Sequence, residues 1–478
     1  MSQAAPHVDP VDDQPELKRV MGPKLLLLFI VGDVLGTGVY ALTGQVAAEV
    51  GGAAWAPFLV AFVIAIITAF SYLELVTKFP QAAGAALYTH KAFGIHFVTF
   101  MVAFAVMASG ITSASTASRA FAENFAVGFD LGVDAEGEPS STLIALVAVC
   151  FILVVAAVNF RGVAESVKAN VVLTMVELSG LLLVIMIGLW AIAGGNADFS
   201  QVVVFESAED KGTFLAVTTA TSLAFFAMVG FEDSVNMAEE TQDPVRIFPK
   251  IMLTGLTITG IIYVLISIVA VALVPLGELE GSDTPLVNVV AAGAPNFPFD
   301  EILPFISMFA VANSALINML MASRLVYGMG KQQVLPAVMA KVHANRRTPW
   351  VAILFTTALA LGLILYVGRL SEDAVKTLGG TTALLLLGVF TVVNVVVLVL
   401  RRQPYEGDHF HAPTALPVIG ALACAFFVSP WSGRDGEQYL VAGILLAIGV
   451  VLWAITWFAN RALRSKKTFM RDPSDLGG

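Results

Sequence analysis

Four acidic residues lie in strongly apolar surroundings and have the strongest claim to chemistry in this chain. Asp33 lies in the first long apolar run, Glu177 in the fifth, and Glu232 and Asp233 in the sixth. A charged side chain at the centre of a bilayer costs about 2.5–3.5 kcal/mol even on the scale from insertion experiments, so such residues are usually functional or neutralised. Burial favours the protonated form of a carboxyl group, which suits a proton carrier. We therefore expect Glu177 and Glu232 to carry or gate protons.

Other interpretations of these acids stay open. A protonated carboxyl group that bonds a neighbouring helix is purely structural, and this interpretation applies to Glu177 and Asp233. The negative charge of Asp33, Glu232 and Asp233 would also favour a basic or amine ligand. Asp33 is therefore expected either beside a bound ligand or among the proton-coupling and gating residues.

Two of the apolar runs are interrupted by glycines. The first contains Gly32-Asp33-Val34-Leu35-Gly36-Thr37-Gly38 and the sixth contains Gly230-Phe231-Glu232-Asp233. A segment in lipid must satisfy its backbone groups by staying helical, unless the exposed backbone faces a protein-lined cavity. Paired interruptions in corresponding places of two halves indicate a binding site at mid-membrane.

The two interruptions suit the two charged groups of an amino acid. Backbone N–H groups freed at Gly36–Gly38, aided by the dipole of the following half-helix, suit a carboxylate. Carbonyl groups freed before Gly230 accept hydrogen bonds from an ammonium group, and Phe226 is placed to cover the bound molecule. The alternatives are close helix packing for the glycines and lipid-facing or core packing for the phenylalanines.

About twelve apolar runs must position these residues. Of the 478 residues, 57 % are hydrophobic and only 13 % are charged, and the mean hydropathy is +0.83. This composition excludes a soluble globular protein, because runs of 18 or more apolar residues indicate membrane spans. The runs are 23–47, 53–78, 92–125, 141–160, 168–194, 213–238, 248–275, 300–330, 349–367, 374–400, 412–430 and 437–460.

The distribution of basic residues predicts the orientation of these spans. With both termini in the cytoplasm, the Lys and Arg residues gather on the cytoplasmic side, as expected for a plasma (inner) membrane protein. The exceptions on the outer side are Arg119, Lys211, Arg369, Lys376 and Arg434. The outer loops are acidic instead, at Asp130–Glu138, Glu206–Asp210 and Glu278–Asp283.

The spans divide into two sets of five and a final pair. Each set begins with an interrupted span, and an odd number of spans makes the second set enter from the opposite side as an inverted repeat. We predict a cytoplasmic tail at 1–22, a first five-helix repeat at 23–200, a second inverted repeat at 201–402, helices 11–12 at 403–460, and a cytoplasmic tail at 461–478.

Signatures of an enzyme are not found in the sequence. The six histidines form no metal-binding spacing, and the phosphate-binding pattern GxxxxGK[ST] does not occur, so we expect no catalytic residues, no metal site and no cofactor. Cys150 and Cys424 both fall inside spans, so no disulfide framework is expected. The partners predicted are an amino acid substrate, protons and membrane lipids, with no nucleic acid and no obligatory protein partner.

Three motifs in this order resemble one family. They are Gly36-Thr37-Gly38-Val39-Tyr40-Ala41-Leu42-Thr43-Gly44, then Phe225–Glu232 followed by Glu239-Glu240 and Pro244, and finally Arg324–Gly330 followed by Lys341-Val342-His343 and Thr348-Pro349. The chain resembles the amino acid–polyamine–organocation (APC) superfamily over nearly all of its spans. Within that superfamily it is most similar to bacterial relatives of the cationic amino acid transporters.

The resemblance implies a fold, an activity and a set of site residues. The fold is an all-α integral membrane protein of the LeuT type, with 12 transmembrane helices, a five-plus-five inverted repeat, discontinuous helices 1 and 6, and two extra C-terminal helices. The activity is secondary active permease transport of a small zwitterionic or cationic amino acid by alternating access, as proton-coupled symport or as exchange. The substrate-binding residues it implies are Val34, Gly36, Thr37, Gly38, Phe226, Ala227, Val229 and Gly230.

The chain also departs from the family pattern. Several proton-coupled members carry a lysine in span five, where this chain has Glu177, and this puts a lysine-based coupling mechanism in doubt. Glu232 matches a position where many members carry an acid linked to pH-dependent gating, whereas Asp33 lies where relatives often have a small residue. The alternatives are a polyamine or organic-amine transporter of the same fold, and a transport-inactive sensor or partner subunit.

Overall fold

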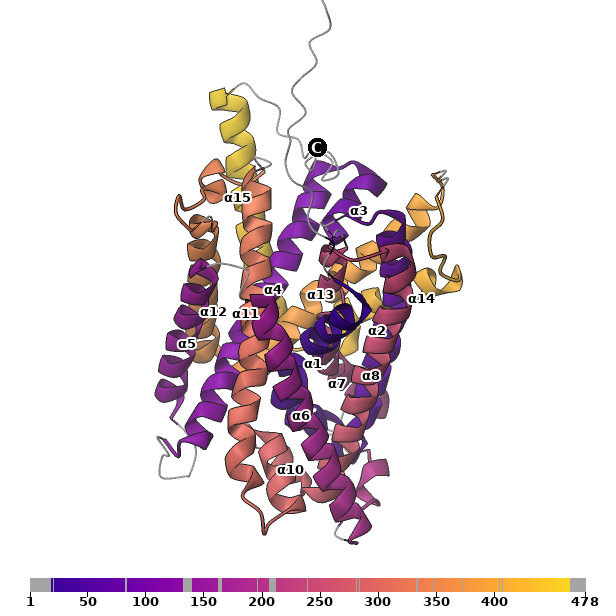
Figure 1. Cartoon of the computed structure of the whole chain (residues 1–478), viewed down its shortest axis with the longest axis vertical. Coiled ribbons are helices and arrows are strands. Elements are labelled where there is room, and N and C mark those ends of the chain that lie inside the picture. Colours follow the sequence, from indigo (N-terminus) through magenta and orange to yellow (C-terminus); the bar gives the residue numbers. More distant parts are fainter. Residues whose placement is uncertain are drawn as a thin grey trace, which may run out of the picture.

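The computed structural model shows a bundle of α-helices interrupted by short 3₁₀ segments (Figure 1). Within the described residues it contains no strand, and one isolated β-bridge joins Met21 to Thr241. The predicted tails lie largely outside the described residues, as do most of the predicted acidic loops around 130–138 and 206–210. The structure describes residues 19, 21–81, 84–131, 140–161, 166–195, 197–205, 212–238, 240–280, 282, 284–331, 334–346, 348–371, 373–403, 405 and 407–464.

The helix boundaries follow local sequence signals. Pro23 and Pro244 occupy first helical positions, where the missing N–H group of proline costs nothing. The helices are α1 Pro23–Val50, α2 Trp55–Lys78, α3 Gly84–Phe93, α4 His96–Gly128, α5 Ser141–Arg161, α6 Ser166–Ala193, α7 Thr213–Ala224, α8 Pro244–Leu273, α9 Leu276–Glu280, α10 Pro285–Gly293, α11 Phe299–Lys331, α12 Trp350–Leu370, α13 Ala374–Leu400, α14 Ala415–Val428 and α15 Gly436–Arg464.

Eleven segments among the described residues are long and apolar enough to cross a membrane. The predicted run 412–430 is the exception, because only Ala415–Val428 forms a helix there, with 14 residues. At a rise of about 1.5 Å per residue this helix is about 21 Å long, shorter than a hydrocarbon core of about 30 Å. The chain is thus a multi-pass membrane protein, and the twelfth span stays a prediction.

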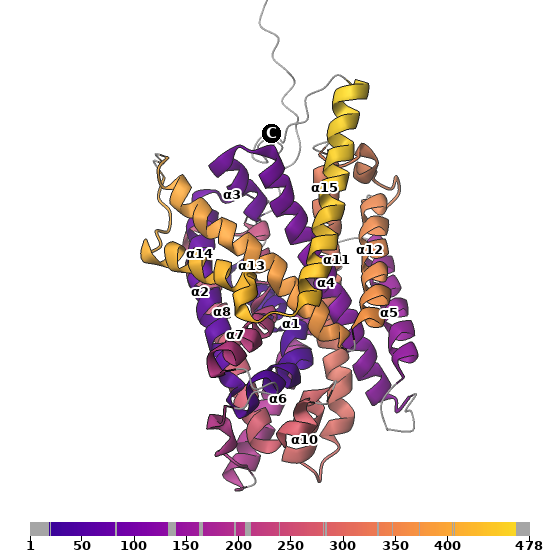
Figure 2. The same cartoon turned by 180° about the vertical axis from the view of Figure 1, so that it is seen from behind.

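Helix α1 lies at the centre of the bundle. Both views place it between α4 and α11 on one side and α2 and α8 on the other (Figures 1 and 2). Of its most apolar window 83 % is buried, against 28 % for α5 and for α15 at the periphery. A central helix contacts protein on every face, so the interruption in it faces protein rather than lipid.

Polar contacts join α14 to the rest of the bundle. Asn394 of α13 donates to Thr68 Oγ1 of α2 at 3.2 Å and accepts from Ser71 Oγ at 2.6 Å. The sulfur of Cys424 on α14 lies 3.6 Å from Thr68 Oγ1. A Cβ at Gly420 would lie 2.6 Å from Asn394 Oδ1, so glycine lets α14 approach α13 closely. Small residues and buried amides are the usual means of helix association in lipid.

The two ends of α13 are tied by ion pairs. Near its beginning, Lys376 Nζ lies 2.8 Å from Glu49 Oε1 at the end of α1. Just after its last residue, the guanidinium of Arg401 donates to both carboxylate oxygens of Glu74 on α2, at 2.8 and 2.6 Å. This bidentate hydrogen bonding raises the pKa of Arg401. These pairs link α13 to the helices beside the interruptions.

Candidate functional site

The interruption in α1 is confined to one residue. Gly36 alone departs from helical geometry, with φ −11° and ψ −148°, and the helix continues on both sides. A Cβ at Gly36 would lie 2.1 Å from Ser314 Oγ of α11, so a side chain at this position requires the Ser314 hydroxyl to move. The predicted break in the first span is present, and it is confined to Gly36 rather than extending over Gly36–Gly38. The residues on either side of Gly36 keep helical geometry, so α1 is kinked at this one residue.

The interruption in the sixth span is much longer. Helix α7 ends at Ala224, and 3₁₀ segments follow at Phe225–Met228 and Asp233–Met237. Between them Gly230 has φ +121°, a conformation that residues with a side chain rarely adopt. No α-helix resumes in the described residues until Pro244. The predicted break near Gly230 is confirmed, and it begins earlier than predicted.

The two interruptions face each other at backbone distance. A Cβ at Gly38 would lie 2.4 Å from Ala227 Cα, and a Cβ at Gly230 would lie 2.8 Å from the carbonyl oxygen of Asp33. Gly38 therefore serves close packing, which was the alternative interpretation of the glycines. The same packing brings residues some 190 positions apart in sequence to one point, as the numbering of Gly38 and Ala227 shows.

A small polar cavity lies between the interruptions. Its volume is about 20 Å³, enough for about one water molecule and too small for an amino acid. All of the predicted substrate-binding residues line it except Ala227, whose backbone packs on Gly38 instead. The complete lining is Asp33, Val34, Gly36, Thr37, Gly38, Ser113, Phe226, Val229, Gly230, Asp233, Ser314 and Asn318.

Three lining residues were not predicted from the sequence. Ser113 comes from α4, and Ser314 and Asn318 come from α11. The sequence does contain a pattern that indicates two of them. Ser314 and Asn318 are four residues apart, so these polar side chains share one face of a helix inside an apolar run. Ser113 belongs to the run of small polar residues Thr112–Ser118.

The polar groups around the cavity differ in their bonding. Asp33 Oδ2 and Thr37 Oγ1 are buried and have no hydrogen-bond partner in the described part of the protein. The carbonyl group of Val34, in contrast, accepts from the hydroxyl of Tyr263. On the opposite wall Gly230 N–H donates to Glu232 Oε2 at 2.9 Å. Buried polar groups rarely stay unpartnered, so Asp33 and Thr37 are the groups available to a ligand.

Glu177 lies behind the cavity rather than in its wall. It is completely buried on α6, and neither of its carboxyl oxygens has a partner among the described residues. Its own carbonyl group accepts from the hydroxyl of Tyr40 on α1 at 3.2 Å. One turn earlier, Thr174 packs where a Cβ at Gly32 would lie, 1.9 Å from its hydroxyl. Glu177 is thus held against α1 with its carboxyl group unbonded.

The four acids form one electrostatic cluster. Glu177, Glu232 and Asp233 all interact electrostatically with Asp33. In the described part of the chain none of the four forms a salt bridge with Lys or Arg. Four carboxylates that share a buried site cannot all stay ionised without compensating positive charge. The cluster therefore favours protons or a cationic group.

Two histidines approach a different acid. His409 and His411 place ring nitrogens near the Glu74 carboxylate, with all three ligand atoms within 4.8 Å of one another. The sequence spacing had indicated no such grouping. Both oxygens of Glu74 are already engaged by Arg401, and one also accepts from Ala412 N–H at 2.9 Å. A metal ion would have to displace this ion pair.

Comparison with known proteins decides the family. A family model described as amino acid permease matches residues 24–470. The chain belongs to this family. A methylthioribose transporter of Bacillus subtilis is 26 % identical over 91 % of this chain and 93 % of its own length. A branched-chain amino acid permease of the same organism is also 26 % identical, over 92 % and 93 %.

Cationic amino acid transporters are similar as well. Cationic amino acid transporter 9 of Arabidopsis thaliana is 31 % identical over 68 % of this chain and 58 % of its own length. The predicted resemblance to the APC superfamily and to cationic amino acid transporters is thereby confirmed. The permease is not an enzyme, and its relatives are amino acid permeases and other transporters. Their names span several substrate types, so the names leave the transported side chain open.

Proposed function

We propose that this permease is a secondary active transporter that moves a small zwitterionic or cationic amino acid by alternating access, coupled to protons as symport or working by exchange. The observation that carries the proposal is the cavity between two facing helix interruptions. It combines exposed backbone, unpartnered buried oxygens and concentrated negative charge at one point. Such a site suits a small molecule that carries both an anionic and a cationic group.

The two ends of the substrate have separate places in this proposal. The backbone N–H groups at Gly36–Gly38 and the Thr37 hydroxyl bind the carboxylate. The carbonyl groups at Phe226 and Val229, with Asp33 close by, bind the ammonium group, and the Phe226 ring covers it. Gly36, Thr37, Phe226 and Val229 all line the cavity, which supports this assignment.

Binding requires the walls of the cavity to separate. At about 20 Å³ the space holds about one water molecule, so the substrate enters only when α1 and the sixth span move apart. The ion pairs Lys376–Glu49 and Arg401–Glu74 lie at the ends of α13, where they open and close with such a movement. Alternating access then consists of breaking one pair while the other persists.

Protons enter the proposal through two acids. Glu177 is buried and its carboxyl group has no partner among the described residues, so we expect it to gain or lose a proton as solvent access changes. Glu232 accepts from Gly230 N–H, and protonation weakens this bond because a charged acceptor bonds more strongly than a neutral one. Protonation of Glu232 therefore loosens the sixth-span interruption. Glu177 carries the coupling proton, and the protonation state of Glu232 controls the opening of the sixth-span interruption.

The proposed topology completes this account. It has twelve spans, with α14 as a short eleventh span, both termini in the cytoplasm, and the plasma (inner) membrane as location. The units are the tails 1–22 and 461–478, the inverted repeats 23–200 and 201–402, and helices 11–12 at 403–460. The positions of the two interruptions, in the first and sixth spans, support the repeat.

A polyamine or organic-amine transporter is the second candidate, and the acid cluster favours it. Counterflow in proteoliposomes decides between these functions. Purified permease is loaded with unlabelled compound, and uptake of the labelled compound is followed for each of the twenty amino acids and for common polyamines. Saturable counterflow with an amino acid supports the proposal, counterflow with polyamines alone supports the second candidate, and no counterflow with a folded protein indicates a sensor or partner subunit.

A further inference from the structure

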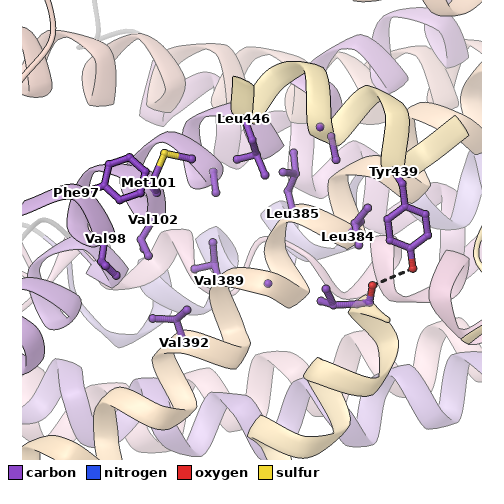
Figure 3. A pocket seen from close by; sticks show the side chains of 15 residues that line it. Phe97, Val98, Met101, Val102, Leu384, Leu385, Val389, Val392, Tyr439 and Leu446 are labelled. Atoms are coloured by element: carbon purple, nitrogen blue, oxygen red, sulfur yellow. Dashed lines mark hydrogen bonds between the residues drawn. The ribbon is translucent and has the colours of Figure 1, made fainter. Parts of the chain in front are cut away.

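A second hollow of the molecule lies on its periphery. It is a groove of about 520 Å³ between α4, α13 and α15 (Figure 3). Phe97 and Met101 of α4, Leu385 and Val389 of α13, and Leu446 of α15 point into it. Its lining and the lining of the mid-membrane cavity have no residue in common. The groove is therefore a separate feature that the transport site does not explain.

The chemistry of the groove admits only an apolar occupant. Tyr439 carries the only hydroxyl among the lining side chains, and it already donates to the carbonyl group of Val428 at 2.8 Å (Figure 3). A polar solute would lose its own hydrogen bonds there without gaining replacements. A hydrocarbon chain makes no hydrogen bonds and therefore loses none in the groove.

The groove opens to the surrounding membrane. Cβ atoms at Gly388 of α13 and Gly443 of α15 would meet no atom within 4 Å, so these glycines leave open space. The neighbouring outward side chains of α15, Leu440 and Ile444, are 48 % and 40 % exposed and apolar. Hydrocarbon is the medium around such a face. Bulk lipid is as apolar as the groove, so the hydrophobic effect does not favour the groove over the bilayer. A hydrocarbon chain is held there by the van der Waals contacts that it makes with the lining side chains when it fills the groove.

A cationic aromatic cluster continues from one end of the groove. Phe97 contacts Trp453 of α15, with ring centres 4.9 Å apart, and Trp453 Nε1 donates to His96 Nδ1 at 3.0 Å. Trp453 stacks on Trp457, and the Arg461 guanidinium lies 4.4 Å from the Trp457 ring centre. Tryptophan and basic residues at a helix end mark the headgroup region, where they attract anionic lipids.

We propose that the groove binds one acyl chain of an anionic glycerophospholipid, with the headgroup at Arg461. The apolar lining selects the chain, and the charge of Arg461 selects the headgroup. The lipid lies beside two helices that reach the transport site. Helix α4 supplies Ser113 to the cavity, and a Cβ at Gly379 of α13 would lie 3.4 Å from the Phe226 ring. The bound lipid is thus placed to influence transport without contacting the substrate.

Native mass spectrometry of the purified full-length permease tests this proposal, with phosphatidylglycerol and phosphatidylcholine of identical acyl chains as probes. Gly388→Phe fills the groove, whereas Gly388→Ala is the matched control, since it adds a single methyl group to open space. Arg461→Gln removes the headgroup partner. We expect wild type and Gly388→Ala to retain one phosphatidylglycerol, and Gly388→Phe to lose it by about tenfold in occupancy. Arg461→Gln should reduce the preference for phosphatidylglycerol by about fivefold.

Three outcomes overturn the proposal. The first is equal phosphatidylglycerol occupancy in Gly388→Phe and Gly388→Ala. The second is equal retention of both lipids by wild type, which removes the headgroup from the site. The third is a wild-type dimer that Gly388→Phe dissociates, which assigns the groove to a second copy of the chain. Thermal unfolding of each variant in detergent confirms that lipid loss does not reflect unfolding. Failure of this test leaves the transport proposal untouched, because none of the three variants alters a residue that lines the mid-membrane cavity.

Discussion

The two helix interruptions differ in an unexpected way. In α1 a single residue, Gly36, leaves the helix, yet two buried polar atoms beside it lack partners in the described structure, on Asp33 and Thr37. In the sixth span two 3₁₀ segments flank Gly230, yet its polar groups bond one another. Gly230 N–H donates to Glu232 at 2.9 Å, and Asp233 N–H donates to the Gly230 carbonyl at 3.0 Å.

This contrast separates geometric distortion from availability for binding. The less distorted helix offers the free groups, and the more distorted segment is satisfied internally. A bonded but irregular segment can rearrange by exchanging its own hydrogen bonds, whereas a nearly intact helix cannot. We infer that α1 supplies the fixed ligand groups and that the sixth span moves, which frees its carbonyl groups for the ammonium group.

The largest effect is expected where the two interruptions meet. Gly38→Ala places a Cβ 2.4 Å from Ala227 Cα, and the backbone there has no room to yield. Misplacement of the site by about 1 Å lowers transport by about 100-fold. Gly328→Ala on α11 is the matched control, because its Cβ meets nothing within 4 Å. Counterflow rates of both variants give the comparison, and wild-type rates in Gly38→Ala would show that the contact is dispensable.

The next largest effect is expected from substitution of Glu177. Its carboxyl group makes no hydrogen bond to α1 or to any other described residue. Glu177→Gln keeps the shape and removes the titratable proton. We expect accumulation driven by a proton gradient to disappear while counterflow at equal pH persists. Uptake with and without the gradient measures both. Gradient-driven accumulation at the wild-type level in Glu177→Gln would remove this residue from the coupling mechanism.

A smaller effect is expected from the internal bond of the sixth span. Glu232→Ala frees Gly230 N–H and should lower counterflow by about tenfold, the value of one hydrogen bond to a charged group. Glu232→Gln retains an acceptor oxygen for the same N–H group and should lose much less. The ratio of the two counterflow rates separates the contribution of the hydrogen bond to Gly230 N–H from that of the negative charge of Glu232. Equal losses in both variants would mean that charge alone matters, contrary to the contrast drawn here.

Parts of this site could be predicted from sequence for a clear physical reason. Glycines and acids are costly in lipid, so Gly36, Gly230 and the four acids stood out against their surroundings. The extent of each interruption could not be predicted, because it depends on partners from other helices. Ser314 of α11 lies against Gly36, and the Asp33 carbonyl lies against Gly230.

The fold shows the same limit. Apolar runs located the long helices among the described residues, although α8 begins at Pro244, four residues before the run 248–275. The run 412–430 looked like a full span, yet its helix begins only at Ala415 and ends at Val428. The apolar composition of a segment predicts that it lies in the membrane, but it does not predict the residues at which its helix begins and ends. The lack of a bonding partner for Glu177 is likewise a property of packing that no local pattern contains.

The central claim is that the unpartnered groups of α1 bind the substrate, and equilibrium binding of a labelled amino acid to Thr37→Val tests it most directly. The Thr37 hydroxyl has no partner in the described structure, so its removal should leave protein stability unchanged and weaken binding by about fivefold, the value of one hydrogen bond. Thr43→Val is the control on the same helix, because the Thr43 hydroxyl is bonded to the Val39 carbonyl group and does not line the cavity. Weakened binding in Thr37→Val alone supports the account. Equal affinity in wild type and Thr37→Val, with both proteins folded, would contradict it.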